Sequence, residues 1–397
     1  MRILQVIPYF PPAYAFGGPV KAAYLISREL AKKGHDVTVY TTDVGDFNSR
    51  LKVSSYEVIE KVKVYRFNNL SLRFVKKLKF FITPKLIPFL SKEIRKFDII
   101  HLHEYRTFQN IVIHRYAKKH SIPYILQARG SISRIGSWPT LKWIYDVFFG
   151  YRILRDSSGV IALNHIEAEK YRFMGIPKEK IAIVPNGIDL SEYANLPPKG
   201  SFKEKYNIPL DKKIVLYLGR IHKIKGIDLL IKAYMYLINY MNFKDIILVI
   251  AGPDDGFLDE IKALIKKLRI KDILLTGPLY GRDKLEAFVD SEVYVLPSRY
   301  ETFPNTILEA YACSKPVIAS NVEAISDIVL HKKTGLLFKV GDIKDLAYAI
   351  AYVLTHPVEA LEMGREANKF VKDNFSIERI INLFEMLYEK ILRSSAF

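Results

Sequence analysis

The sequence has very little cysteine and glutamine, and it contains no long apolar run. Cys313 is the only cysteine among the 397 residues, which excludes a disulfide within the chain and a thiolate zinc site. Apolar residues never form a run of about 18, and the N-terminal apolar stretch is too short and too rich in proline for a signal peptide. We therefore expect a cytoplasmic protein without a transmembrane helix, in which Cys313 is a small buried residue.

Motifs for metals and nucleic acids are missing as well. The nine histidines show no spacing typical of a metal site, and no RNA-recognition, helix-turn-helix or zinc motif occurs. Rare glutamine beside abundant lysine, arginine and glutamate is a thermophile-like bias rather than a functional signal. The net charge of +18 implies polyanionic partners, which include nucleic acid, an acidic membrane surface and phosphorylated ligands. A basic nucleic-acid-binding protein stays open as an alternative, although no motif supports it.

Strands and helices alternate along two parts of the chain, which predicts an α/β protein with two doubly wound parallel sheets. Continuous apolar runs such as "ILQVIP" and "KIVLYLG" are typical of strands buried on both faces. A proline-rich, charged stretch separates the two series. We expect an N-terminal domain over 1–190, a linker over 191–211, a C-terminal domain over 212–375, and a C-terminal helix over 376–397 that packs back on the N-terminal domain.

The loop after the first strand of the second half is rich in cations. Gly219 is expected to let the chain turn sharply, and Arg220, Lys223 and Lys225 follow it. A guanidinium can bind phosphate oxygens with two hydrogen bonds, and an ammonium adds a point charge. A solvated basic loop is the alternative interpretation of this segment.

The segment "RYETFPNTILEAYACSKP" follows the fourth strand of the second half. Thr302 or Phe303 is expected to cap a helix that has Pro304 in its first turn. The free N–H groups at a helix start bind anions, so those near Asn305 and Thr306 can meet a phosphate. The sequence therefore places an anion site at the start of this helix.

Two glutamates flank that helix start. Glu309 can accept two hydrogen bonds from a vicinal diol such as ribose, and Glu301 can reach a second hydroxyl-bearing group beyond the phosphates. Taken singly, Glu301 could be a surface loop carboxylate and Glu309 an exposed helix residue. Their position at strand ends, together with Arg220 and Lys225, favours a functional role.

Glu301 and Glu309 match the E-x7-E motif of retaining, family-4-type glycosyltransferases of the GT-B fold. Further segments that resemble this family in order are the Gly17–Gly18 pair, "HLHEY", "IAIVPNGID", "LGRIHKIKGIDLLI", "ETFPNTILEAYACSKPVIAS" and "HKKTGLLF". The resemblance covers nearly the whole chain. It implies two Rossmann-like domains facing across a cleft and transfer of a sugar from a nucleotide-sugar donor, in the synthesis of cell-surface polysaccharide or glycoconjugate.

The resemblance also implies a role for each matching residue. Glu309 would hold the donor ribose, Glu301 the donor sugar, and Arg220 with Lys225 the diphosphate. The donor would be UDP- or GDP-linked, and the acceptor a sugar, glycolipid or lipid-linked molecule. The fixed cations can replace a metal, so we expect neither a metal nor another cofactor. The remaining donor-binding candidates are Gly18, Gly219, Phe303, Pro304, Asn305 and Thr306.

The first half is expected to hold the acceptor. Gly17 and Gly18 permit close backbone approach to a phosphate or to the acceptor. His103 ends a strand and resembles a family position near the cleft, with a core or supporting histidine as the alternative. Arg129 stands where many relatives place histidine near the donor sugar. Arginine cannot act as a base at neutral pH, so it would hydrogen-bond donor or acceptor hydroxyls or an anionic group.

Residues 73–96 predict a basic amphipathic helix. Eight basic side chains accompany one acid, and Phe74, Leu78 and Phe81 would share its apolar face with Val75 and Ile82. Such a helix suits an anionic membrane surface, which makes a peripheral location on the inner face of the cell membrane an expectation. A core-packing helix with a solvated basic side is the alternative.

Two other functions are compatible with the same fold. A nucleotide-sugar epimerase would use the same diphosphate site, but it needs extra acid and base groups near the anomeric carbon, and no convincing set occurs. A catalytically silent sugar-nucleotide binder is disfavoured because Glu301, Glu309, Arg220 and Lys225 are all present.

Overall fold

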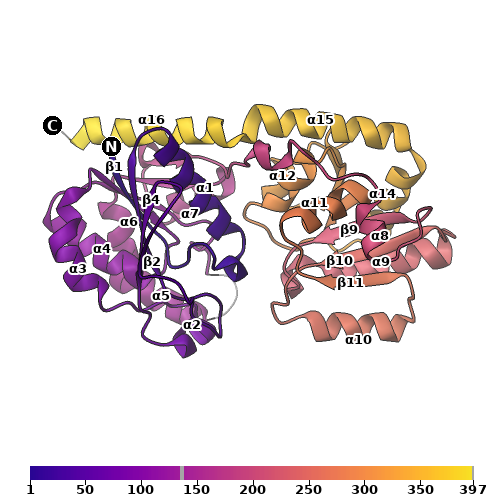
Figure 1. Cartoon of the computed structure of the whole chain (residues 1–397), viewed down its shortest axis with the longest axis horizontal. Coiled ribbons are helices and arrows are strands. Elements are labelled where there is room, and N and C mark those ends of the chain that lie inside the picture. Colours follow the sequence, from indigo (N-terminus) through magenta and orange to yellow (C-terminus); the bar gives the residue numbers. More distant parts are fainter. Residues whose placement is uncertain (135–137, 396–397) are drawn as a thin grey trace. The chain divides into compact units, whose positions relative to one another are not determined.

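The computed structural model describes residues 1–134 and 138–395, which form two compact units. Unit 1 comprises Met1–Gly187 together with Ile377–Phe397, and unit 2 comprises Ile188–Ser376 (Figure 1). The chain thus passes from unit 1 to unit 2 near residue 190, where the first domain is expected to end. Each unit has its own sheet and its own apolar core.

Unit 1 is built on an eight-stranded sheet with the order β3-β4-β2-β1-β5-β6-β7-β8. Alternate residues of the central strands supply the cores on its two faces, Ile3 on one and Leu4 on the other. This explains the continuous apolar runs in the sequence. The strands are β1 (Arg2–Val6), β2 (Asp36–Thr42), β3 (Tyr56–Ile59), β4 (Val62–Phe67), β5 (Ile99–His103), β6 (Tyr124–Gln127), β7 (Gly159–Ala162) and β8 (Ile181–Ile183).

The sheet of unit 1 is parallel, as expected, except at one edge. Strand β3 pairs antiparallel with β4, and Glu60 and Lys61 form the turn between them with φ of 45° and 70°. A tight hairpin turn of this kind usually has Asn-Gly or Gly-Gly at those positions. Because neither residue is glycine or asparagine, the turn has no signal in the sequence.

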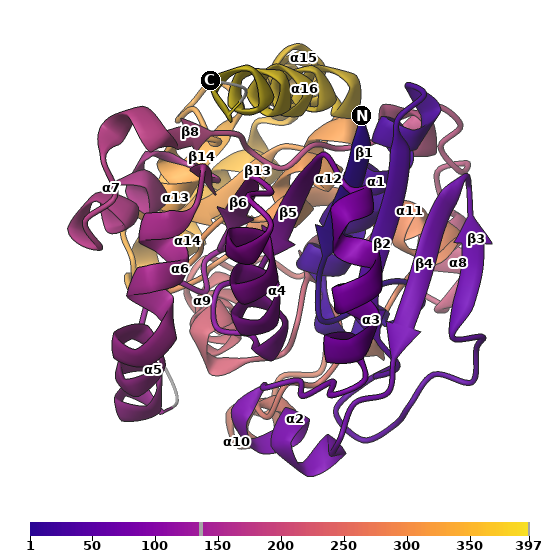
Figure 2. The same ribbon diagram turned by 90° about the vertical axis from the view of Figure 1, so that its left-hand side faces the viewer.

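Helices cover both faces of the unit 1 sheet. Figure 2 shows α3 and α4 in front of the strands, and the core on that face also includes residues of α6 and α7. The opposite face packs against α1 and α16. The helices and short turns are η1 (Tyr14–Phe16), α1 (Gly18–Lys32), α2 (Leu72–Leu78), α3 (Leu86–Glu93), η2 (Ile94–Lys96), α4 (Phe108–Lys119), α5 (Pro139–Tyr145), η3 (Asp146–Gly150), α6 (Tyr151–Asp156), α7 (His165–Phe173), η4 (Lys178–Lys180) and α16 (Ile377–Ser395).

The C-terminal helix α16 belongs to unit 1, although it follows unit 2 in the chain. Its apolar side supplies Ile380, Phe384 and Tyr388 to the core beneath α1. On its polar side Glu385 accepts a hydrogen bond from Lys33 and lies 2.8 Å from His35 Nε2. These contacts fix the helix on the N-terminal sheet. Residues 396 and 397 of the expected C-terminal segment lie outside the described part of the chain.

Residues 73–96 do not form one amphipathic helix. Helix α2 ends at Leu78, because Lys79 adopts a left-handed conformation with φ of 51°, and α3 begins only at Leu86. Val75 and Phe81 are buried in a small core with Val44. The apolar residues of this segment are therefore divided between the core and the surface.

Unit 2 contains a six-stranded, wholly parallel sheet with the order β11-β10-β9-β12-β13-β14. Its strands are β9 (Lys213–Leu218), β10 (Ile246–Ala251), β11 (Ile273–Gly277), β12 (Ser291–Leu296), β13 (Val317–Ser320) and β14 (Gly335–Phe338). The helices and turns of this unit are η5 (Leu190–Tyr193), α8 (Ser201–Lys205), η6 (Lys223–Lys225), α9 (Ile227–Tyr240), α10 (Leu258–Leu268), α11 (Gly281–Asp290), α12 (Asn305–Ala312), α13 (Glu323–Ser326), α14 (Ile343–Thr355) and α15 (Pro357–Phe375).

The segment 191–211, expected to be a linker, is an integral part of unit 2. Phe202 of α8 is fully buried in the unit 2 core. The carboxylate of Asp290 on α11 accepts hydrogen bonds from the backbone N–H groups of Gly200 and Lys203, at 2.5 and 3.0 Å. Prolines and charges dominate the segment in sequence, so its few anchoring residues are not evident there.

Candidate functional site

The central strands of unit 2 create a switch point. From β9 the chain moves to β10 and β11 on one side of the sheet, then returns to β12 on the other side. The loops that follow β9 and β12 therefore leave the carboxyl edge at neighbouring positions. Ligands of open parallel sheets bind at such points. These are the two loops in which the sequence places the cations and Glu301.

Backbone packing holds the two loops against each other. Gly226, at the start of α9, has φ of 68°, and a Cβ atom there would lie 1.9 Å from the carbonyl oxygen of Pro297. Only glycine permits this approach. The chain bends at Gly219 as expected, although Gly219 itself is not left-handed. The close approach instead involves Gly252, whose added Cβ would lie 1.8 Å from the Gly219 carbonyl oxygen.

Lys225 and Glu301 form an ion pair between these loops. The distance from Lys225 Nζ to Glu301 Oε1 is 2.6 Å, and the two side chains are 16% and 8% exposed. Ser298 Oγ donates a second hydrogen bond to the same oxygen, at 2.7 Å. Glu301 is thus a largely buried and paired carboxylate. The alternative of an ordinary surface loop residue does not describe it.

Arg220 extends from the same loop and forms an ion pair with Asp255, which follows β10. The guanidinium is still 42% exposed, so part of its donor surface faces solvent. The sequence alone does not indicate that Asp255 pairs with Arg220. A bound phosphate would have to compete with Asp255 for this side chain, or share it.

A second arginine clamps the loops and was not expected. Arg299 makes two parallel hydrogen bonds to Asp228 in the first turn of α9, both 2.8 Å long. Its backbone N–H and its side chain also donate to the carbonyl oxygens of Ile224 and Lys223. Hydrogen bonding from Arg299 lowers the pKa of Asp228, against the opposing effect of burial. Arg299 therefore fixes the turn that carries Lys225.

Helix α12 begins at Asn305, with Pro304 as its N-cap and no side-chain hydrogen bond at that cap. The expectation that Thr302 or Phe303 caps the helix is wrong. Phe303 instead packs its ring against Phe375 at a centroid distance of 6.0 Å. Thr306 Oγ1 lies 2.6 Å from the hydroxyl of Tyr294, which ties the first turn to β12.

Glu309 lies one turn further along α12 and is buried. Its Oε1 accepts a 2.8 Å hydrogen bond from Lys284 Nζ on α11, and the two side chains are 10% and 16% exposed. Burial lowers the pKa of Lys284, but the Glu309 charge and hydrogen bond outweigh this effect and raise it above 10.5. The alternative of an exposed helix residue does not describe Glu309. Sequence reasoning missed Lys284, since it lies in an otherwise ordinary amphipathic helix.

Burial and the nearby charge of Glu309 also act on Cys313. Together they raise the pKa of this buried thiol to about 12. Cys313 is therefore a neutral, inert residue at neutral pH, as the sequence suggests.

In unit 1, His103 lies at the end of β5 with no exposed surface. Arg129 Nε donates to His103 Nδ1 at 3.1 Å, which leaves Nε2 protonated toward Gln5 Oε1 at 2.5 Å. Burial lowers the pKa of His103 well below 6.5, and the neighbouring His101 and Arg129 add to the effect. Both ring nitrogens have partners, so the geometry favours the alternative of a supporting histidine over the expected catalytic one.

Arg129 follows β6 and is itself buried. Its Nη1 donates to Asn186 Oδ1 at 2.8 Å, whereas its Nη2 has no hydrogen-bond partner among the described residues. Burial lowers the pKa of Arg129 to about 10 despite the opposing charges of Glu104 and Glu167. The guanidinium therefore remains charged at neutral pH and keeps one donor for a further group.

Gly17 and Gly18 precede and begin α1. Gly17 has φ of 78° and is the N-cap of the helix, whose second residue is Pro19. A Cβ atom on Gly17 would meet no heavy atom within 4 Å, so conformation rather than crowding requires glycine here. Both glycines belong to unit 1.

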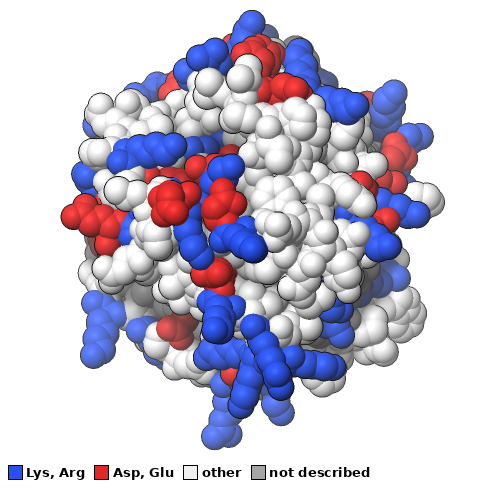
Figure 3. Space-filling model, turned by 90° about the vertical axis from the view of Figure 1, so that its right-hand side faces the viewer, with Lys and Arg blue, Asp and Glu red and all other residues white. Residues whose placement is uncertain are grey.

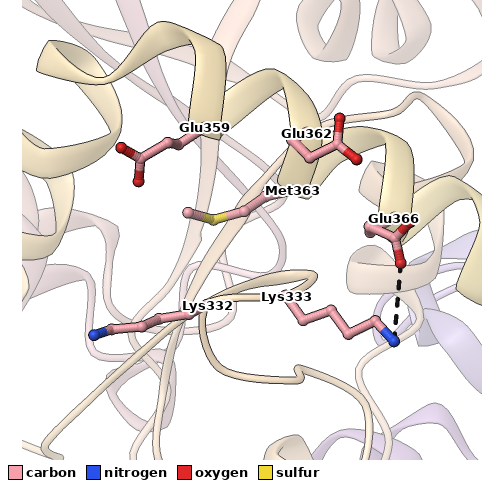
Figure 4. Close-up of a pocket in the computed structure, with 6 residues that line it drawn as sticks. All are labelled: Lys332, Lys333, Glu359, Glu362, Met363 and Glu366. Atoms are coloured by element: carbon pink, nitrogen blue, oxygen red, sulfur yellow. Dashed lines mark ion pairs between the residues drawn. The ribbon is translucent and has the colours of Figure 1, made fainter.

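Two surface hollows of unit 2 differ in position. One of about 330 Å³ lies between α15 and the turn before β14, where Lys333 and Glu366 are 3.9 Å apart (Figure 4). It lies at the amino edge of the sheet, opposite the switch point. The other, of about 420 Å³, is lined by residues from Asp254 to Ala263 and follows β10 at the carboxyl edge. Position in the sheet favours the second as part of a ligand site.

Among residues 1–134 and 138–395, no group of three or more His, Cys, Asp or Glu side chains is arranged to hold a metal ion. Within the same described residues, no helix combines the length and apolar character needed to cross a membrane.

Two family models match consecutive parts of the chain. The model for Glycosyltransferase Family 4 matches residues 16–192, and the model for Glycosyl transferases group 1 matches residues 198–370. Together they account for most of both units. The chain belongs to the group 1 glycosyltransferases and has their GT-B fold.

Known proteins that are similar in sequence or in structure cover almost the whole chain. An uncharacterised glycosyltransferase of Methanocaldococcus jannaschii is 26% identical over 99% of this chain and 100% of its own length. Sucrose-phosphate synthase from Thermosynechococcus elongatus has a TM-score of 0.80 and 20% identity, covering 99% of this chain and 100% of that chain. HepE from Anabaena, in complex with UDP and glucose, has a TM-score of 0.78 and 18% identity, covering 98% of this chain and 100% of that chain.

Proposed function

We propose that this glycosyltransferase moves a sugar from a UDP- or GDP-linked donor to a sugar, glycolipid or lipid-linked acceptor, with retention of anomeric configuration. Its place would be the synthesis of cell-surface polysaccharide or glycoconjugate, in the cytoplasm and at the inner face of the cell membrane. UDP is the first nucleotide to test, because HepE, which shares the fold, was solved with UDP and glucose.

The Lys225–Glu301 pair carries this proposal. It joins the loop after β9 to the loop after β12 at 2.6 Å, directly before α12. A cation, a carboxylate and a helix start therefore lie within one small region of the carboxyl edge. The cation and the helix start can bind phosphate oxygens, and the carboxylate can accept hydrogen bonds from sugar hydroxyls.

In the proposed reaction the bond between the sugar C1 and the diphosphate oxygen breaks, and its electron pair stays on the diphosphate. The acceptor oxygen forms the new bond to C1 on the same face, and its proton passes to a leaving phosphate oxygen. Negative charge grows on the diphosphate in this step. Arg220 and Lys225, with the N–H groups at the start of α12, would stabilise that charge and lower the barrier.

Glu301 and Glu309 would bind different parts of the donor. We assign the sugar to Glu301, because it shares the loop with the diphosphate cations, and the ribose to Glu309 further along α12. The Lys284 ammonium donates a hydrogen bond to Glu309 Oε1 and so orients the carboxylate, whose oxygens can accept hydrogen bonds from hydroxyl groups. Gly219, Phe303, Pro304, Asn305 and Thr306 would shape the walls of this donor site.

The acceptor is assigned to unit 1. Gly17 and Arg129 would face it, and Gly18 would approach the donor phosphate. Arg129 retains a donor on Nη2, which supports a contact with a hydroxyl or an anionic group. His103 holds Arg129 through Nδ1 and is assigned a positioning role rather than a catalytic one.

No observation favours an epimerase or a nucleic-acid-binding protein over this function. An epimerase would change the free nucleotide sugar without an acceptor and would release no nucleoside diphosphate. A glycosyltransferase releases nucleoside diphosphate and consumes the acceptor. Product analysis therefore distinguishes the two activities on one donor.

A thermal-shift panel of UDP-, GDP- and ADP-sugars tests the proposal first. A ligand at 100 times its dissociation constant stabilises the fold by about 2.7 kcal/mol, which such a scan detects. The stabilising donor is then incubated with acceptor sugars, and the anomeric configuration of the product is read by NMR. Inversion would contradict the retaining mechanism, and the failure of every nucleotide sugar to stabilise the protein would contradict the donor assignment.

A further inference from the structure

Unit 1 exposes an unusual group of large apolar side chains around α5 and η3. We define the apolar ridge as Trp138, Leu141, Trp143, Ile144, Phe148 and Phe149, all of which are exposed. Trp143 is 51% exposed and Phe148 is 61% exposed. Six exposed large apolar side chains within residues 138–149 are unusual for a protein surface and indicate that this surface binds something.

Buried anchors fix the ridge in this orientation. On its inner side Tyr145 donates a hydrogen bond to the Thr107 carbonyl oxygen at 3.0 Å. Asp146 has no exposed side-chain surface and pairs with Arg106 and Arg134, each at 2.8 Å. The inward residues are thus held by hydrogen bonds and charge pairs, so the outward apolar residues cannot turn into the core.

Helix α2 lies beside the ridge. Trp138 Nε1 donates to the Lys77 carbonyl oxygen at 3.1 Å, and Figures 1 and 2 both show α2 and α5 at the same end of unit 1. Phe74 and Leu78 of α2 are also exposed. The apolar surface therefore continues from one helix to the other.

Basic side chains predominate in the two segments that form this surface. Residues 72–79 and 138–152 contain six basic side chains, and their one acid is the buried Asp146. The basic residues are Arg73, Lys76, Lys77, Lys79, Lys142 and Arg152. Within these two segments the exposed surface thus combines aromatic side chains with an excess of positive charge.

We propose that this surface docks on an anionic lipid bilayer, with the apolar ridge inserted at the headgroup level. Tryptophan is favoured at membrane interfaces, and stable attachment takes both an apolar anchor and a basic patch. Protein interfaces, by contrast, are depleted of lysine. The charge around the ridge therefore favours anionic lipid over a protein partner.

The docking surface differs from the one expected from residues 73–96 alone. It uses the exposed part of α2, but its principal apolar residues come from α5 and η3. It is also independent of the proposed sugar transfer, because attachment requires neither donor nor acceptor. The inference rests on the membrane location that is part of the proposed function, whereas failure of vesicle binding would leave the sugar transfer itself unaffected.

The chain offers a matched basic surface without the aromatic residues. Figure 3 shows Lys and Arg gathered at the lower end of one face of unit 2, the end at which Figure 1 places α10. Lys262, Lys266 and Lys267 of that helix are exposed, and within the described residues α10 has no exposed large apolar side chain. Helix α10 therefore serves as a control that distinguishes simple charge attraction from docking through the apolar ridge.

Tryptophan fluorescence provides a direct readout, because both tryptophans of the chain, Trp138 and Trp143, lie in the ridge. Vesicles of phosphatidylcholine with phosphatidylglycerol should shift the emission to the blue and sediment the full-length protein. Vesicles of phosphatidylcholine alone should do neither to a comparable extent. An unchanged emission, with the protein left in the supernatant, would overturn the proposal.

Variants locate the contact. The double variant Phe148→Ser with Phe149→Ser keeps both tryptophans and should weaken vesicle binding by about tenfold for each phenylalanine. Phe173→Ser, at a side chain 91% exposed on α7, is the matched control and should bind as the parent does. Equal losses in the two, or parental binding by the double variant, would overturn the assignment to the ridge.

Charge variants test the basic part. Lys76→Gln with Lys77→Gln should weaken binding by about fivefold for each lysine at low salt, and by less at high salt. Lys266→Gln with Lys267→Gln on α10 should have little effect. Equal losses of vesicle binding in the α2 and α10 variants would overturn the assignment of the lipid contact to α2 and the apolar ridge. A dimer in sedimentation velocity that the phenylalanine variant dissociates, with no response to vesicles, would show that a second copy covers the ridge instead.

Discussion

Lys225 Nζ lies 2.6 Å from Glu301 Oε1, so a cation assigned to the diphosphate rests on a carboxylate assigned to the sugar. The pair is mostly buried, and each partner would be costly to leave alone. A donor that brings both phosphate and hydroxyl groups could satisfy the two side chains separately. We therefore expect a bound nucleotide sugar to replace the ion pair with its own contacts to the two side chains.

The first prediction concerns the diphosphate cations. Lys225→Ala and Arg220→Ala should each lower turnover by about 10²–10³, because negative charge grows on the leaving group. The measurement is kcat for nucleoside diphosphate release, with the unfolding midpoint measured beside it. Stability should change much less than turnover.

Lys223→Ala is the matched control for these variants. Lys223 belongs to the same η6 turn, but its side chain is exposed, so its removal should change turnover only slightly. Turnover of the Lys225 or Arg220 variant within a few-fold of the parent would remove that residue from the diphosphate site.

The second prediction separates the two glutamates. Glu309→Ala should weaken both free nucleoside diphosphate and the intact donor, since ribose is common to them. Glu301→Ala should leave nucleoside diphosphate affinity nearly unchanged while turnover collapses, because a hydroxyl contact of the transferred sugar is lost. Calorimetric titration of nucleoside diphosphate into both variants measures the difference.

Lys284 supplies a control for Glu309. Lys284→Met removes the ammonium that pairs with Glu309 and should weaken nucleoside diphosphate through the misplaced carboxylate, with a smaller loss than Glu309→Ala. Equal losses of affinity in the Glu301 and Glu309 variants would mean that the carboxylates share one role. The division of labour proposed above would then be abandoned.

The third prediction concerns metal. Because Arg220, Lys225 and the start of α12 are assigned to the diphosphate charge, turnover should survive excess EDTA. Nucleoside diphosphate release is measured with and without the chelator, and after addition of magnesium or manganese. Complete loss with EDTA that either ion restores would overturn the metal-free mechanism.

Apolar runs predicted much of the fold because strands buried on both faces leave that pattern. Strands β1 and β9 fall on the runs "ILQVIP" and "KIVLYLG" that predicted them. The β3–β4 hairpin was missed because its turn residues, Glu60 and Lys61, adopt positive φ without glycine or asparagine. The helix expected over residues 73–96 breaks at Lys79 for a similar reason.

The loop positions of the candidate site residues could be predicted from the sequence, whereas contacts between distant loops could not. Arg220, Lys225 and Glu301 follow strand ends, and the position of strand ends is evident from sequence. The partners Asp255 and Lys284 come from other elements, so only the folded arrangement shows that they meet Arg220 and Glu309. His103 also ends a strand, and its complete burial depends on packing that the sequence does not show.

The last prediction concerns pH and the buried histidines of unit 1. Burial lowers the pKa of His103 and of His101 well below 6.5 in the folded state, and Arg129 adds to both shifts. Below about pH 6.5 the unfolded chain binds protons that the folded chain does not, so these residues reduce stability as pH falls. Burial raises the pKa of Glu104 and Glu167 above 4.5, which reduces stability as pH rises from that value.

A comparison of variants isolates the histidine contribution, because the carboxyl contributions cancel between them. Urea unfolding of unit 1 is followed by the fluorescence of Trp138 and Trp143, both of which belong to that unit. Between about pH 7 and 5, His103→Gln should lose less stability per pH unit than the parent, by at most about 1.4 kcal/mol. His165→Gln, at an exposed position on α7, should keep the parental slope. An unchanged slope in His103→Gln would show that His103 takes up its proton as readily in the folded chain as in the unfolded one, which its burial between Gln5 and Arg129 should prevent.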